Sequence, residues 1–312
     1  MIEAIEQDIK VTEDKFVIIG CEDQDSEKIS RPSITYWQDA WRRFKSNKVA
    51  IGAAILLALI ILLTIFGPAI SSYKFDTMNP DATNLPPSSD HWFGTDDMGR
   101  DIFTRVCMGG RVSIIIGLLC TLVMITLGVI YGGVAGYLGG TVDDVMMRIV
   151  EIIGSVPYLV LVILISLILG RGMFALVIAM TITSWGGVAR LVRGQVLQLR
   201  EKEYILAEQA LGASPSRIIL KHLLPNTFSL VIVQILFAVP GFIFSEAFLS
   251  YIGLGIQPPD TSWGALASGA QQFLMFYPYQ LFFPCLFISL TMLSFNLMGD
   301  GLNDALDPRL RQ

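Results

Sequence analysis

Long runs of apolar residues, separated by short polar segments, dominate this chain. A helix that crosses the hydrocarbon core of a bilayer needs about 20 predominantly apolar residues. Such runs predict six transmembrane helices, at about residues 49–70, 112–138, 151–170, 173–189, 226–250 and 281–299. We therefore expect an all-α membrane protein with six transmembrane helices, whose transmembrane domain covers residues 49–299.

Composition and charge agree with lipid as the main solvent. Of the 312 residues, 53% are hydrophobic and 16% are charged, whereas soluble domains carry about 25% charged residues. Most Lys and Arg lie before residue 49, between residues 189 and 226, and in the tail at 300–312. Because segments rich in Lys and Arg stay on the cytoplasmic side, this distribution predicts cytoplasmic termini and a location in the cell membrane.

The N-terminal region has two patterns. Residues 1–35 are rich in Asp and Glu and have little periodicity, which predicts a flexible acidic cytoplasmic tail. In residues 36–48, Trp37, Trp41 and Phe44 share one helical face beside several basic residues. This second pattern is typical of an amphipathic helix in the headgroup layer. The alternative is that these residues form the first cytoplasmic turns of the helix that follows.

Several residues in or beside the predicted spans indicate packing, kinks or a polar position. Glycines spaced four apart form a stripe that lets helices approach closely: Gly128, Gly132, Gly136 and Gly140. Pro157, Pro240 and Pro284 favour kinks. Glu246 is the one acid inside a predicted span, where a charge costs about 2.5–3.5 kcal/mol on insertion scales. It either lines a polar pathway or lies near the outer end of its helix in wetter surroundings.

The groups that common enzyme classes require are missing from the sequence. The two histidines, His91 and His222, exclude an H-E-x-x-H motif and a His-rich metal site. Neither a G-x-x-x-x-G-K-[ST] phosphate loop nor a G-x-S-x-G elbow occurs. The spans also lack the chains of paired charges that proton-driven transporters use. We therefore expect no enzymatic activity, and no cofactor, metal or nucleic acid bound by this chain.

The long segment at residues 190–225 carries the most informative pattern. Residues 203–225 read EYILAEQALGASPSRIILKHLLP, which predicts two helical arms on either side of Gly212. Ser214 is a candidate N-cap of the second arm, and Pro215 suits its first position. The second arm also combines an apolar patch with two bases: Ile218, Ile219, Leu220, Arg217 and Lys221. Such a helix–turn–helix suits docking on a soluble partner, and a solvated connector is the alternative.

This segment resembles the EAA loop, the cytoplasmic coupling loop of ATP-binding cassette (ABC) importer permeases. That pattern is E-A-A, three residues, Gly, nine residues, then I-x-L-P. Ala207, Gly212, Leu224 and Pro225 match it at the right spacing. The departures stand where the pattern has its Glu, its second Ala and its Ile: Leu206, Glu208 and His222.

Further stretches are similar to the C-type permease subunit of oligopeptide and dipeptide importers. They are residues 91–116, 248–264 and 296–311, and residues 185–199 favour the oligopeptide branch. The resemblance implies the type I ABC importer permease fold. Permeases for dipeptides, nickel and other peptide-like solutes share much of this pattern and are alternatives. A membrane scaffold that binds a soluble partner without transport is a further alternative, whereas the coupling loop argues against a secondary transporter.

The resemblance also implies partners and residue roles. The chain would form half of an oligopeptide pore with a second, homologous permease subunit in the lipid bilayer. Two cytoplasmic ATPase subunits would bind ATP and Mg, and an extracytoplasmic peptide-binding protein would deliver the substrate. Docking on the ATPase would involve Ala207, Glu208, Gly212, Ala213, Ser214, Pro215, Arg217, Lys221 and Pro225. The candidate pathway or outer-loop residues are Glu246, Trp263, Asp96 and Asp97.

Overall fold

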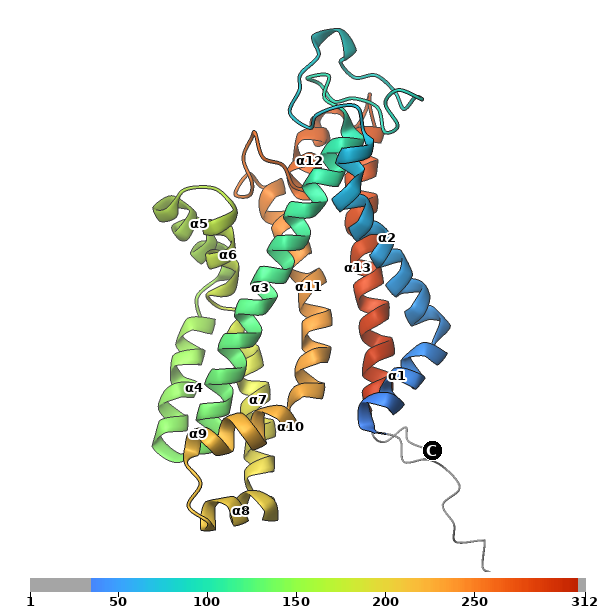
Figure 1. Cartoon of the computed structure of the whole chain (residues 1–312). Helices are drawn as coiled ribbons and strands as arrows, with labels where there is room; N and C mark the ends of the chain where they lie inside the picture. Colours follow the sequence, from blue (N-terminus) through green and yellow to red (C-terminus); the bar gives the residue numbers. More distant parts are fainter. Residues whose placement is uncertain (1–34, 308–312) are drawn as a thin grey trace, which may run out of the picture. The chain divides into compact units, whose positions relative to one another are not determined.

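The computed structural model describes residues 35–307 (Figure 1). Most of the predicted acidic tail at 1–35, and the end of the predicted tail at 300–312, lie outside the described residues. The chain divides into two compact units, Met1–Asp39 and Ala40–Gln312. Between residues 35 and 307 every regular element is a helix, which confirms the predicted all-α class.

The segment predicted as an amphipathic helix forms a helix of its own. α1 (Tyr36–Ser46) is separated from α2 (Lys48–Ile70) by Asn47, whose side chain accepts hydrogen bonds from two backbone N–H groups of the first turn of α2. This N-cap starts a new helix, so residues 36–48 are not simply the first turns of the span. Phe44 is buried, whereas Trp41 is 56% exposed and has the Lys45 ammonium 5.1 Å from its ring centroid. The location of α1 in the headgroup layer stays a prediction.

Four helices of the described chain are long and apolar enough to cross a membrane, namely α2, α3 (Ile102–Leu138), α11 (Phe228–Tyr251) and α13 (Tyr279–Leu306). Two further pairs of helices are long and apolar enough to cross a membrane only when the two helices of each pair are taken together. They are α4 (Gly140–Gly154) with α5 (Tyr158–Leu169), bent by 80°, and α6 (Met173–Thr181) with α7 (Trp185–Arg200), bent by 41°. Counting each pair as one broken span gives six spans, the predicted number.

Two helices extend beyond the predicted spans. α3 begins at Ile102 rather than near residue 112, because the Asp101 carboxylate accepts a hydrogen bond from the backbone N–H of Thr104 at 2.9 Å and caps the helix. α7 continues to Arg200, well past the predicted end at 189. Apolar runs locate the membrane-embedded part of a helix, whereas caps decide where the helix begins or ends.

The three prolines predicted to kink spans have different positions. Pro157 lies before α5, at the 80° break between α4 and α5. Pro240 and Pro284 lie inside α11 and α13, which continue past them. Proline lacks the N–H that a helix interior needs, and at Pro157 the chain ends one helix and starts another.

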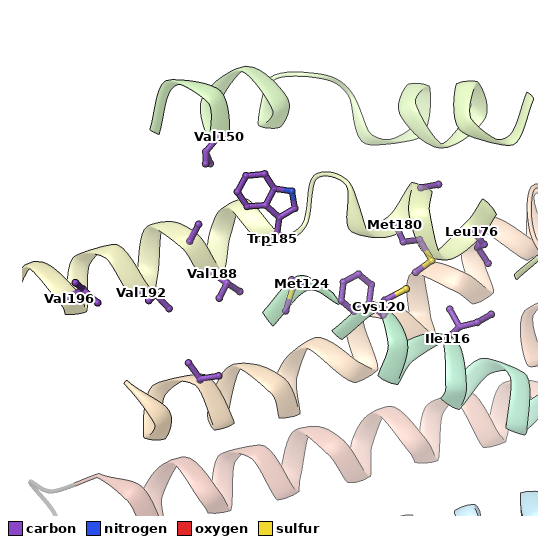
Figure 2. Close-up of a cluster of buried hydrophobic side chains, with 14 of the residues drawn as sticks. Ile116, Cys120, Met124, Val150, Leu176, Met180, Trp185, Val188, Val192 and Val196 are labelled. Atoms are coloured by element: carbon purple, nitrogen blue, oxygen red, sulfur yellow. The ribbon is translucent and has the colours of Figure 1, made fainter. Parts of the chain in front are cut away.

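α3 is the central helix of the unit that begins at Ala40, and it packs against α2, α7 and α11 (Figure 1). One apolar core joins α3, α4, α6, α7 and α11. Figure 2 shows part of this core, with Ile116, Cys120, Met124, Val150, Leu176, Met180, Trp185, Val188, Val192 and Val196 labelled. A second core surrounds Trp263 between α2, α3, α11 and α13.

Short helices connect the long ones. Two 3₁₀ turns, η3 (Pro80–Ala82) and η5 (Gln271–Phe273), and one short helix, α12 (Trp263–Ala270), lie in the segments after α2 and α11. Between α7 and α11 the chain forms α8 (Glu203–Ala210), α9 (Pro215–Arg217), the π-helix η4 (Ile218–Leu223) and α10 (Leu224–Asn226). This last group contains the predicted coupling loop.

Candidate functional site

The turn between the two arms of the coupling loop is built around Gly212. α8 ends with the Ala213 N–H bonded to the Glu208 carbonyl and the Gly212 N–H bonded to the Gln209 carbonyl, both at 3.0 Å. Gly212 has a φ of +79°, a left-handed conformation that glycine adopts at helix C-termini without strain. The predicted division into two arms at this residue is therefore observed, and its cause is the backbone conformation of Gly212.

The second arm begins as predicted but continues differently. Ser214 occupies the N-cap position and Pro215 follows it, yet the Ser214 hydroxyl lies 3.3 Å from the hydroxyl of Ser216 and caps no backbone N–H. After α9 the helix widens into the π-helical turn η4. A π-turn changes which residues share a face, and such turns are frequent at functional sites.

The burial of two of its residues corrects the predicted apolar patch. Ile218 and Ile219 are buried in the core that joins α3 and α7, so they attach the coupling loop to the membrane helices. The large apolar side chains left on the outside of the two arms are Leu211, Leu220, Leu206 and Tyr204, between 45% and 85% exposed. The bases Arg217 and Lys221 are exposed as well, so a docking partner meets a surface that is both apolar and basic.

Glu208 and His222, two departures from the EAA pattern, lie next to each other. The Nε2 atom of His222 is 3.4 Å from a carboxylate oxygen of Glu208, and both side chains are less than one-third exposed. Glu208 belongs to α8 and His222 to η4, so this contact joins the two arms. The distance permits an ion pair when His222 is protonated, but the geometry is not that of a hydrogen bond.

The glycine stripe packs α3 against α7, the helix that leads into the coupling loop. A Cβ atom added at Gly128 would lie 2.6 Å from the Val188 side chain, and one at Gly132 would overlap the carbonyl oxygen of Ala189. Gly136 faces the backbone of Arg193. Gly140 does not belong to this contact, because α3 ends at Leu138 and nothing lies within 4 Å of a Cβ at Gly140.

Glu246 and Trp263, the two predicted pathway or outer-loop residues beyond α3, are both fully buried. The Glu246 carboxylate accepts hydrogen bonds from the hydroxyls of Ser113 and Ser250, each at 2.7 Å. Ser113 also accepts a bond from the Trp263 backbone N–H, and the Trp263 indole N–H donates to the Val106 carbonyl at 2.9 Å. These residues fasten α12 to α3 and α11. Glu246 is fully buried near the end of α11 at Tyr251, and its place in a pathway stays a prediction.

Asp96 organises the segment before α3 rather than facing a partner. One carboxylate oxygen accepts bonds from the backbone N–H groups of Met98 and Arg100, and the other lies 2.7 Å from the Arg100 guanidinium and 3.3 Å from that of Arg105. Asp97 is partly exposed. Its carboxylate lies close enough to interact electrostatically with the Arg105 guanidinium.

Charged residues of α4 and α7 also meet, although the sequence analysis did not single them out. The Arg193 guanidinium makes two parallel bonds of 2.5 Å to the Asp143 carboxylate. Asp144, Arg148 and Glu151 are exposed along α4. Their spacing of four and three residues, in an otherwise apolar stretch, is the signal that could have revealed them.

Comparison with known families agrees with this architecture. Residues 124–312 match the family described as binding-protein-dependent transport system inner membrane component. Residues 35–87 match the N-terminal TM domain of oligopeptide transport permease C. The chain therefore belongs to the membrane-embedded permeases of binding-protein-dependent ABC importers.

Particular relatives narrow this class to two named groups. The chain is 51% identical to the oligopeptide transport system permease protein OppC of Bacillus subtilis (strain 168), over 92% of this chain and 94% of the relative. It is 48% identical to the dipeptide transport system permease protein DppC of the same strain, over 98% and 96%. It is 43% identical to OppC of Escherichia coli (strain K12), over 92% and 95%.

A solved structure supports the fold. The chain resembles a chain of the inward-facing MetNI methionine ABC transporter with a TM-score of 0.52 and 19% identity, over 65% of this chain and 96% of that one. Together with the family match, this confirms the type I importer permease fold and the membrane location. The cytoplasmic placement of the termini stays a prediction.

Proposed function

We propose that this chain is one of two permease subunits of an ATP-driven oligopeptide importer and forms half of its translocation pore. The observation that carries this proposal is the two-sided coupling loop. Its inner side, Ile218 and Ile219, is buried in the transmembrane core, while Leu211 and Leu220 are exposed. A loop fixed on one side and apolar on the other suits transmission of a partner's motion to the membrane helices.

The proposed division of labour assigns no catalysis to this chain. Two cytoplasmic ATPase subunits bind ATP and Mg, and each permease docks on one of them through its coupling loop. Both termini of the permease lie in the cytoplasm. ATP binding can change the pore only if the docked ATPase contacts the inward-open and outward-open states differently. The rigid attachment of η4 to α3 and α7 is the route by which that difference reaches the spans.

An extracytoplasmic peptide-binding protein delivers the substrate to the opposite side. The surfaces available to it are residues 71–105, which contain the partly exposed Asp97, and residues 252–280. α12 within the second segment is held by the buried bonds of Trp263. This second surface is therefore fixed relative to α3.

Oligopeptides are the proposed substrates because the relatives named OppC include the 51% identical protein and because residues 35–87 match the oligopeptide permease family. Dipeptides are the second candidate, since the relative named DppC is 48% identical over 98% of this chain. Uptake of labelled peptides of two to six residues by cells that express the full importer distinguishes the two.

Co-purification of a tagged copy tests the proposed assembly. Mild-detergent extracts should yield this chain with one sister permease and two ATPase subunits. Vesicles containing that complex should accumulate peptide only with ATP and the peptide-binding protein present. Recovery of this chain as a homo-oligomer without ATPases would instead support a membrane scaffold.

A further inference from the structure

α4 has three chemically different faces. Asp143 and Val150 are buried on the face toward α7. A second face exposes Val145, Ile149 and Ile152, each between 44% and 60%. The third face carries Asp144, Arg148 and Glu151, at positions i, i+4 and i+7, and all are exposed. Residues at this spacing form one stripe along a helix.

The charged stripe borders a cavity. A cavity of about 580 Å³ lies between α4 and α7 and is lined by Asp144, Met147, Arg148, Glu151, Arg190 and Arg193. Arg193 is paired with Asp143, and Arg148 lies 2.7 Å from Glu151. Arg190 makes no hydrogen bond or ion pair with any residue between 35 and 307. The cavity therefore presents both signs of charge, including a guanidinium with a free donor set.

The charges of this face favour a polar neighbour over lipid. α4 forms half of a broken span, and charged side chains in spans face a bundle interior or a water-filled cavity. The adjacent apolar face already suits lipid. The volume beside this face, about 580 Å³, is within the range of small-molecule sites, about 300–1,000 Å³.

We propose that the charged face of α4, with Arg190 of α7, forms a wall of the water-filled translocation route and binds the charged termini and backbone of a passing peptide. This inference rests on the proposed function and names a substrate-contacting surface for it. Asp144 and Glu151 accept hydrogen bonds from the peptide's ammonium and amide N–H groups, and Arg190 donates to its carboxylate. Charges of both signs fit the zwitterionic ends common to all peptides, so the wall discriminates little between side chains.

Water access is tested by cysteine labelling in the assembled importer. The background replaces Cys21, Cys107, Cys120 and Cys285 with Ala and retains peptide uptake. A membrane-impermeant sulfonate thiol reagent should modify Glu151→Cys about tenfold faster or more than the matched variant Ile149→Cys, because a thiol must ionise in water before it reacts. Equal rates overturn the proposal. A Glu151→Cys thiol that resists the reagent but forms a disulfide with a cysteine of the sister permease also overturns the proposal. That result would identify a subunit interface.

Peptide contact is tested separately with Arg190→Gln. Vesicles with saturating binding protein should show a KM about two- to fivefold higher for peptides with a free C-terminal carboxylate, the size expected for one partly exposed charged contact. The same peptides with an amidated C-terminus should be unaffected. Arg171→Gln, in the turn between α5 and α6, is the matched control and should change neither. An equal change for both peptide types overturns recognition of the carboxylate.

These results separate the inference from the function on which it rests. A wild-type complex that imports no peptide refutes the proposed function, and the labelling rates of α4 are measured without transport. Normal uptake together with slow, equal labelling of both faces refutes only the assignment of the α4 wall.

Discussion

Single buried polar residues join α3, α11 and α12 at one end of the transmembrane unit. Glu246 has no exposed surface, yet the Ser113 and Ser250 hydroxyls both donate to it. A buried carboxylate is tolerated when hydrogen bonds replace its hydration. The residue that looked most like part of a pathway is thus a joint between α3 and α11.

Replacing Glu246 separates a structural role from a transport role. Glu246→Ala leaves two buried hydroxyls without their acceptor, at a cost of about 1–3 kcal/mol for each group left unpaired. We expect a clearly lower unfolding temperature of the purified complex, a smaller loss for Glu246→Gln, and none for the neighbouring Ser245→Ala. Unchanged stability together with a changed peptide preference would restore the pathway interpretation.

The contact between Glu208 and His222 is a second feature that depends on individual side chains. Either single change, Glu208→Ala or His222→Ile, removes one partner of a contact that joins the two arms. The double variant restores two of the three positions that depart from the EAA pattern and leaves Leu206 unchanged. We expect the double variant to regain peptide-stimulated ATP hydrolysis that each single variant loses, with a coupling energy of about 0.2–1 kcal/mol. Strictly additive losses would show that the two residues act independently.

At the scale of elements, the packing of α3 against α7 depends on close backbone approach. The helices touch where Gly128, Gly132 and Gly136 leave room for the α7 backbone and side chains. Membrane helices gain little from the hydrophobic effect, so such contact supplies much of their association.

Gly132→Ala tests this packing. Its methyl group would overlap the Ala189 carbonyl, and overpacking of this kind costs about 1–3 kcal/mol. The unfolding temperature should fall, whereas Gly187→Ala, with nothing within 4 Å of the new methyl, should leave it nearly unchanged. A Gly132→Ala protein as stable as the wild type would mean that the helices separate at no cost.

The turn of the coupling loop is tested at Gly212. Proline requires φ near −65°, whereas this residue has φ +79°. Gly212→Pro should therefore lower peptide uptake by about tenfold or more while the protein still inserts in the membrane. Gly212→Asn, which tolerates the left-handed conformation, should keep most activity. Uptake at the wild-type rate in the proline variant would refute the coupling role.

Local patterns predicted some elements and long-range contacts decided others. Apolar runs located the spans, and Gly212 with Pro215 located the turn, because these signals lie within a few residues. The burial of Ile218 and Ile219 depends on contacts with distant helices such as α3 and α7, which local pattern does not encode. The burial of Glu246 could not be predicted because its partner Ser113 lies 133 residues away in sequence, and no local periodicity reports such a neighbour.

At the scale of the whole molecule, the proposed function makes the chain one subunit of a larger transport complex. Its sequence has no phosphate-binding loop, so the purified chain alone should hydrolyse no ATP above background. The assembled complex should hydrolyse ATP, and faster with peptide-loaded binding protein. Release of phosphate by the isolated chain, retained after further purification, would contradict the division of labour.

The two broken spans also affect how the chain inserts into the membrane during synthesis. α5 has 12 residues and α6 has 9, about 18 and 14 Å at about 1.5 Å per residue, against a hydrocarbon core of about 30 Å. Each is too short to stop in the bilayer alone during synthesis. They pack against each other, and α6 packs against α3. Because α3 is translated first, we expect it to provide the surface against which α5 and α6 pack, and we expect the third and fourth spans to insert together.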